Sequence, residues 1–313
     1  MNGPGIQGTQ RGVLLAFATA AISGLSVYLN AFGVKLVSDA AVYTTAKNAV
    51  AALILVTIAL LLGARHEATS LAPRPRLGVL AIAVIGGSVP FVLFFSGLAV
   101  ATAPTAAFIH KTMFIWVAFM AVPLLSERLG LLQVGALGVL LAGQALIAPP
   151  VGVGWGPGET MILAATLLWS VEVVVAKRLL AGVSAPLLAA SRMGLGFVIL
   201  MGYLVVSGRV GGFATLTPDA WLWVMVTGGM LSAYVITWYS ALRDAPATVV
   251  TSVLVAAAVI TGALTAATTG RTPSPTVVAG YLLVLVAVGA IGVVATRTRA
   301  RESVDVRRDP APA

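Results

Sequence analysis

The chain has 313 residues, of which 59% are hydrophobic and 9% are charged, and its formal net charge is +9. The mean hydropathy of +1.02 excludes a soluble domain, because such a chain would expose apolar side chains on every face; it indicates a polytopic membrane protein. Cysteine is absent, which excludes disulfides, thiolate metal sites and thiol nucleophiles.

Ten apolar runs of roughly 19 to 24 residues follow one another, and each is long enough to cross ~30 Å of hydrocarbon as a helix. We therefore predict an all-α integral membrane protein with ten transmembrane helices. The connections are too short for a nucleotide-binding domain and contain no Gly-x-x-x-x-Gly-Lys-Ser/Thr loop, so we expect neither ATP drive nor a cofactor or metal. The predicted spans are residues 12–32, 40–63, 77–99, 104–125, 130–148, 158–176, 185–207, 220–241, 246–268 and 276–296.

The basic residues are distributed unequally between the two predicted faces. With the N-terminus inside, three fall outside, namely Lys35, Arg209 and Arg271, and most of the others fall inside. This bias predicts that both termini are cytoplasmic in a multi-pass membrane protein, and it explains the positive charge without a nucleic-acid partner. The inside set is Arg11, Arg65, Arg74, Arg76, Arg128, Lys177, Arg178, Arg243, Arg297, Arg299, Arg301, Arg307 and Arg308.

The two halves of the chain repeat one another. At a constant offset of 142 residues, Asn30 matches Glu172 and Lys35 matches Lys177. Five helices per half force the halves to cross the membrane in opposite senses, so we predict two inverted repeats. Lys47 falls opposite Arg192 after a slip of three residues, and the other matches are Gly86-Gly87 with Gly228-Gly229 and Ala103-Pro104 with Ala245-Pro246.

The repeat divides the chain into five parts. The first repeat covers residues 12–148 and the second covers 158–296, with a linker at 149–157 between them. Residues 1–11 form a cytoplasmic N-terminal segment. Residues 297–313 mix Arg, acidic residues and Pro without apolar periodicity, so we predict a disordered basic cytoplasmic tail near the lipid headgroups.

This arrangement resembles the EamA-type branch of the drug/metabolite transporter superfamily. The resemblance rests on the ten helices in two inverted repeats and on Asn30, Glu172, Lys35, Lys177, Lys47, Arg192 and the Leu-Leu-Ser-Glu127-Arg128 segment that closes the fourth span. It implies an inner-membrane carrier that exports amino acids or other small metabolites through a cavity between the repeats. The chain departs from the family pattern at His110-Lys111 within the fourth span and at Gly270, where the second repeat would echo Glu127.

Glu172 is a carboxylate deep within an apolar run, and a charge placed there marks a functional site unless it is paired. Arg192 lies at a similar predicted depth on the next helix, so the two side chains can pair. Two interpretations remain open for this pair. It is either a structural salt bridge or a gate that breaks when the carrier opens inward.

The outer half of the predicted bundle holds Lys47, Lys111 and His110, with no carboxylate at their depth. Cations that face a cavity there favour a substrate that carries a carboxylate. The alternatives are that Lys47 snorkels to the headgroups and that His110 makes a hydrogen bond between helices or carries a proton. Asn30 and Trp169 complete the predicted substrate site.

Gly86, Gly87 and Pro90 in the third span, with Gly228 and Gly229 in the eighth, are candidate gating residues, because Gly pairs and Pro allow a helix to bend. Close helix packing is the alternative for each glycine. Small residues on the fifth and tenth spans, such as Gly135 with Gly143, leave both internal packing and a homodimer open.

The sequence favours a secondary transporter that works by alternating access and exports a small metabolite such as an amino acid or an organic anion. A multidrug or cation exporter of the same superfamily is the first alternative, and it requires Glu172 to face the cavity free of Arg192. A non-transporting membrane sensor is the second. We predict no enzyme activity, because the chain lacks a His-Glu-x-x-His motif and clustered catalytic groups. The expected partners are the bilayer and a small-molecule substrate.

Overall fold

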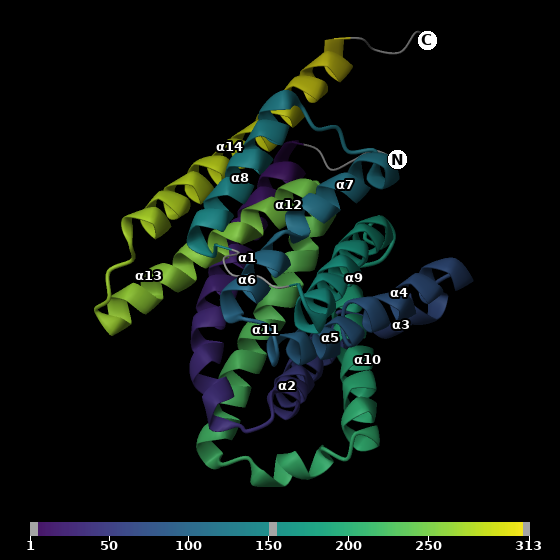
Figure 1. The fold of residues 1–313 in the computed structure, drawn as a ribbon. Coiled ribbons are helices and arrows are strands. Elements are labelled where there is room, and N and C mark those ends of the chain that lie inside the picture. Colours follow the sequence, from purple (N-terminus) through teal and green to yellow (C-terminus); the bar gives the residue numbers. More distant parts are fainter. Residues whose placement is uncertain (1–5, 150–154, 309–313) are drawn as a thin grey trace.

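The computed structural model describes residues 6–149 and 155–308, and every regular element within them is a helix (Figure 1). The first half contains α1 (Ile6–Gly33), η1 (Val34–Leu36), α2 (Ala40–Leu61), α3 (Ala64–Ser70), α4 (Pro73–Ile85), α5 (Val89–Leu98), α6 (Ala103–Lys111), α7 (Met113–Leu125) and α8 (Leu131–Ile147). The second half contains α9 (Pro157–Leu179), α10 (Ala185–Val206), η2 (Val210–Thr215), α11 (Pro218–Asp244), α12 (Ala247–Val253), η3 (Leu254–Ala256), α13 (Ala257–Thr269) and α14 (Pro275–Arg308).

The helices coincide with the predicted spans. Within the described residues, nine helical segments are long and apolar enough to cross a membrane, and the fifth predicted span corresponds to the shorter apolar helix α8. Three of the nine segments each contain two α-helices, namely α4 with α5, α6 with α7, and α12 with α13, which η3 joins. The all-helical membrane fold is therefore confirmed.

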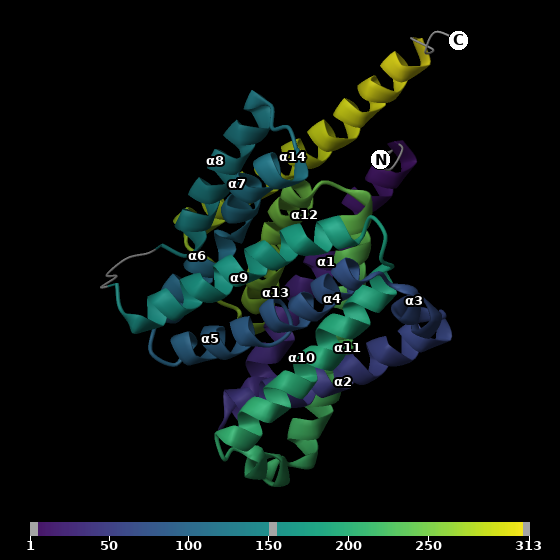
Figure 2. The ribbon, with the colours of Figure 1, turned by 90° about the vertical axis from the view of Figure 1, so that its right-hand side faces the viewer.

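The first helix of each half packs against the other half. Helix α1 lies along α11 and α13, whereas α9 lies along α5, α4 and α7, and both arrangements can be followed in Figures 1 and 2. Equivalent helices of the two halves also pack on each other, because α2 packs on α10 and α8 packs on α14. The two halves are consequently interlocked, and the candidate site residues of α9 lie against helices of the first half.

The third span is broken between α4 and α5, where Gly86, Gly87 and Pro90 predicted a bend. Pro90 lacks an N–H, and its ring excludes a regular helix in the turn before it. The hydroxyl of Ser88 donates to the carbonyl oxygens of Ala83 (3.0 Å) and Val84 (3.2 Å), which satisfies acceptors that the break leaves free.

The eighth span differs, since α11 continues without interruption through Gly228 and Gly229. A Cβ atom at Gly228 would lie 2.7 Å from Cβ of Val50, so this glycine allows close packing on α2. Gly229 faces open space. The gating role of this pair therefore remains a prediction.

The chain ends differ in part from the sequence prediction. The backbone of α14 continues as helix to Arg308, so most of the predicted disordered tail is helical; its Ala, Arg and Glu residues favour a helix. Helix α1 likewise begins at Ile6, inside the predicted N-terminal segment. Residues 1–5, 150–154 and 309–313 lie outside the described part, and so does most of the predicted linker.

Candidate functional site

Glu172 is buried between the two halves, with 1% of its surface exposed. It lies in α9, whose first turn is fixed by a capping bond from the N–H of Gly156 to the carboxylate of Glu159 (3.0 Å). The hydroxyl of Tyr239 in α11 donates to Oε1 of Glu172 at 2.5 Å. This short charge-assisted hydrogen bond links α9, which packs against helices of the first half, to α11.

Arg192 is also buried, with 6% of its surface exposed, and it lies on the other side of Tyr239. Its Cζ atom is 5.8 Å from the centroid of the tyrosine ring, within cation–π range. Among the described residues, no ion pair within 4 Å joins Glu172 to Arg192, and Nε of Arg192 has no hydrogen-bond partner. The two charges are thus separated by Tyr239, and the guanidinium keeps an unused donor.

The equivalent position in the first half is Lys47, since Lys47 and Arg192 are each the eighth residue of a 22-residue helix. Nζ of Lys47 donates to Oδ1 of Asn30 (3.0 Å), and Nδ2 of Asn30 donates to the carbonyl oxygen of Ser26 (2.7 Å). The ammonium also lies 5.8 Å from the ring centroid of Tyr43. Lys47 therefore has a partner inside the protein and does not need to snorkel.

Trp169 connects α9 to the break in the third span. Its Nε1 donates to the carbonyl oxygen of Gly86 at 3.1 Å, another acceptor that the break leaves free. Its ring makes edge contacts with Phe91 (5.3 Å between centroids) and His110 (5.0 Å), and Phe94 lies 5.2 Å from His110. Gly86 also borders Glu172, because an added Cβ would be 2.6 Å from Cγ of the glutamate. The break, Trp169 and Glu172 form one site.

His110 and Lys111 occupy the last turn of α6, directly before the interruption at Thr112. Free carbonyls and the helix dipole favour positive charge at a helix C-terminus, which explains cations at this depth. Nδ1 of His110 is buried without a hydrogen-bond partner. Lys111 is partly buried, and no hydrogen bond or ion pair joins it to a described residue.

A cavity of about 470 Å³ opens between α2, α5 and α10. Its lining includes Thr45, Phe91 and Ser96, and the ion pair between Arg209 and Asp39 (3.8 Å) lies at the start of α2. Phe91 belongs both to this lining and to the aromatic contacts of Trp169. The cavity therefore reaches the site from the end of the molecule that carries Lys35, predicted to be the outer end.

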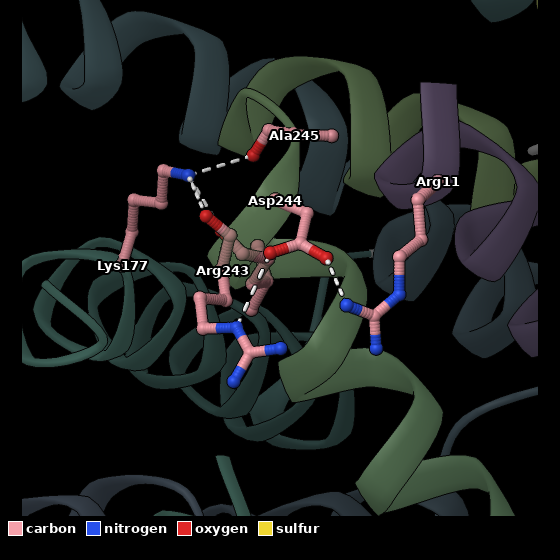
Figure 3. Close-up of polar contacts among 6 residues, drawn as sticks. Arg11, Lys177, Arg243, Asp244 and Ala245 are labelled. Carbon is pink, nitrogen blue, oxygen red and sulfur yellow. Dashed lines mark hydrogen bonds and ion pairs between the residues drawn. The ribbon is translucent and has the colours of Figure 1, made fainter. Parts of the chain in front are cut away.

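Charged side chains close the opposite end. Nζ of Lys177 donates to the carbonyl oxygens of Leu242 (2.5 Å), Arg243 (3.2 Å) and Ala245 (2.8 Å) at the end of α11. Figure 3 shows Lys177 with the labelled residues Arg243 and Ala245. In the same view, Asp244 forms ion pairs with Arg243 (3.2 Å) and with Arg11 of α1 (3.6 Å).

Two glutamates, Glu67 in α3 and Glu127 in the loop after α7, cap helices of the second half at this end. Glu127 accepts from the N–H groups of Ala247 (2.6 Å) and Thr248 (3.1 Å) and from the hydroxyl of Thr248 (2.6 Å). Glu67 accepts from the N–H and hydroxyl of Ser184, both at 2.6 Å. The helix that Glu127 caps begins 120 residues further along the chain, and sequence spacing contains no signal for that partner.

The comparisons with known proteins agree with this architecture. Residues 10–148 and 156–293 each match the EamA-like transporter family. The chain belongs to the EamA-like transporter family. The EamA-like chain is therefore a membrane transporter with two family repeats.

The fold has solved relatives. One solved structure, described only as "Crystal structure of protein", is similar to the EamA-like chain with a TM-score of 0.72 and 18% sequence identity, over 90% of this chain and 98% of that chain. No curated protein matches the sequence.

Proposed function

We propose that this transporter works by alternating access and exports a small metabolite that carries a carboxylate, such as an amino acid or an organic anion. Arg192 carries the proposal, because its guanidinium is buried between the halves and keeps an unpartnered Nε. A buried donor without a partner costs free energy of about 1–3 kcal/mol, and a ligand that accepts from it recovers that cost. Guanidinium groups match carboxylates in shape and charge.

The surrounding groups fit the same substrate class. Lys111 and His110 supply a cation and an unpartnered ring nitrogen near Trp169, whose ring and its Phe neighbours offer an apolar surface for the body of the substrate. The cavity volume of about 470 Å³ lies within the usual range for small-molecule sites. Glu172, Lys47 and Asn30 complete the proposed transport path, and coupling to the proton gradient would use Glu172 or His110.

A cation or multidrug exporter is the second candidate. It requires a Glu172 that is free of Arg192 and faces the cavity. The lack of a direct ion pair between these residues favours it, whereas the 1% exposure of Glu172 and its bond to Tyr239 disfavour it. The balance favours an anionic or zwitterionic substrate.

Two further proposals concern location and assembly. The distribution of basic residues supports the inner membrane with both termini inside. Gly143 packs against another helix of the same chain, since an added Cβ would lie 2.9 Å from the carbonyl oxygen of Gly280 on α14. Gly135, in contrast, faces open space. A homodimer would therefore use the face of α8 that carries Gly135.

The test compares the solutes that cells release when they express the intact protein, Glu172→Gln, Lys111→Ala or Arg192→Lys at equal membrane abundance. We expect a carboxylate-bearing metabolite to accumulate outside with the intact protein and to be lost with Lys111→Ala and Arg192→Lys. Arg128→Ala is the matched control, because Arg128 is exposed in a loop. Release of an organic cation that depends on Glu172 and not on Lys111 would support the second candidate.

A further inference from the structure

The short corner between α11 and α12 is held from both sides by opposite charges. Lys177 donates to three carbonyl oxygens at the C-terminus of α11, and Glu127 accepts from two N–H groups and a hydroxyl at the N-terminus of α12. A cation at a helix C-terminus and an anion at an N-terminus both complement the helix dipole. We call Lys177 and Glu127 together the corner clamp (Figure 3 shows its Lys177 half).

The corner clamp joins two groups of helices. Lys177 belongs to α9 and Glu127 follows α7, and these helices pack on each other and are tied by a bond from Arg178 to the carbonyl oxygen of Leu124 (2.5 Å). Helix α11 packs mainly along α1, and α12 lies between the two groups because it contacts both α7 and α1. A cytoplasmic opening between the two groups would therefore have to break the corner clamp.

The other end of the molecule has an equivalent corner, between α5 and α6. Helix α7 ends on the left-handed residue Ser126 (φ 56°), and α13 ends on the left-handed residue Gly270 (φ 67°). Gly270 is thus the counterpart of Ser126, which corrects the expectation that it stands opposite Glu127. The counterpart of Glu127 is the next residue, Arg271, whose charge is opposite.

Two of the three donors are also missing at that corner. Ala103 begins α6 as Ala247 begins α12, so Pro104 stands where the clamp uses Thr248. Proline has neither an N–H nor a hydroxyl, and an arginine at position 271 could not accept from them. Lys35, the counterpart of Lys177, is exposed in η1. The cavity opens at this same end.

We propose that the corner clamp of Lys177 and Glu127 is the cytoplasmic closure of this transporter, and that the unmatched pair Pro104 and Arg271 makes the outward-open form the resting form. This inference rests on the alternating access proposed above, but it does not depend on the substrate. Lys177 and Glu127 are positioning residues, since they act through the α11–α12 corner and touch no part of the proposed substrate site.

The experiment measures thiol labelling of the purified protein without substrate, so a wrong substrate class cannot affect it. The chain has no cysteine, so each introduced thiol reports alone. Thr251→Cys probes the clamped end, because Thr251 is 1% exposed and lies one turn beyond Thr248 on the same face of α12. Ser96→Cys probes the cavity.

In the Thr251→Cys background, we expect Glu127→Gln and Lys177→Met each to raise the labelling rate about tenfold, the shift in population that follows loss of a charge-assisted hydrogen bond. Labelling of Ser96→Cys is expected to stay the same or fall, because the outward-open form becomes less populated. Arg128→Gln, which changes the neighbouring charge in the exposed loop, should alter neither rate.

Unchanged labelling of Thr251→Cys in both clamp variants, with a lowered melting temperature, would mean a structural role and would overturn the proposal. Equal increases at Thr251→Cys and Ser96→Cys would mean general loosening, with the same consequence. A second variant supplies the missing groups at the other corner, Pro104→Thr with Arg271→Glu. It should raise labelling of Thr251→Cys while the clamp is intact, and no rise would overturn the explanation of the resting form.

Discussion

The two halves of the molecule place different chemistry at equivalent positions. In the first half Lys47 bonds to a neutral amide, Asn30, and in the second half Arg192 is separated from the carboxylate of Glu172 by Tyr239. The first arrangement is complete, whereas the second leaves a buried guanidinium nitrogen without a partner. Of these two clusters, the incomplete one around Arg192 is therefore the one that a ligand can complete.

The third spans of the two halves also differ, and here the irregular element belongs to the first half. The first half has the broken helix of α4 and α5, and the second has the continuous α11. Trp169 and Glu172 both contact Gly86 at the break, so these two side chains of the second half lie against the broken third span of the first half. Four predictions test these differences between the two halves.

Glu172→Gln has the largest expected effect, a loss of about 3–5 kcal/mol of stability, because it leaves Arg192 as a buried charge without a counter-charge. Thermal unfolding in detergent measures it. Asn30→Ala is the matched variant in the first half, and it should cost less because Asn30 is neutral and Lys47 also lies over the ring of Tyr43. Equal losses for the two variants would contradict the comparison.

Gly87→Ala comes next, with an expected loss of about 3 kcal/mol, near the upper end for overpacking. Its Cβ would lie 2.1 Å from the carbonyl oxygen of Arg192 and 3.1 Å from Cα of Gly196, and both neighbours are backbone atoms that cannot move aside alone. Expression level and thermal unfolding report the loss. A variant as stable as the parent would show that the break is pliable enough to separate from α10.

Tyr239→Phe should cost about 2 kcal/mol, because it removes the hydroxyl that donates to Glu172 and keeps the ring beneath Arg192. The same substitution separates two roles in transport. If Tyr239 keeps the opposite charges apart, its loss allows them to pair directly, and the affinity for the exported anion should fall. A binding measurement that shows unchanged affinity would remove Tyr239 from the site.

Gly229→Ala has the smallest expected effect, a gain of about 0.5–1 kcal/mol, since the position faces open space inside a helix. If Gly229 belongs instead to a hinge that bends during transport, the variant should be more stable and should transport more slowly. Thermal unfolding and initial transport rate, measured on one preparation, distinguish the two interpretations. The Gly229→Ala result therefore decides whether the unbroken helix of the second half also moves.

The sequence predicts features that depend on adjacent residues of the chain, but it does not predict which side chains of different helices meet. Apolar runs predicted the spans, because length and hydropathy alone decide which segments can cross a bilayer. Pro90 and its glycines predicted the break in the third span, since the cause is local to the backbone. The pairing of Lys47 with Asn30 and the cap that Glu127 makes on α12 were not predicted. The position of a residue in its helix gives its depth in the membrane, but it does not say which side chains of other helices lie beside it.

Residue counting across the repeat was also an imperfect guide. The offset of 142 residues aligned Ala103-Pro104 with Ala245-Pro246, but Pro104 lies inside α6 while Pro246 is the N-cap of α12. Loops of different length shift the register between one helix pair and the next. The equivalence of Pro104 with Thr248 became visible only from the helix bounds.

The first helix of each half packs against the other half, and this packing has a consequence for synthesis of the protein. Helix α1 finds its main partner in α11, so about 200 residues must be made after α1 before that contact can form. At a usual rate of about 5–20 residues per second, α1 waits on the order of 10–40 s in the membrane. During that interval Asn30 can already pair with Lys47, because both belong to the first two helices. This pair, which is complete within the first two helices, thus suits the part of the chain that must persist alone.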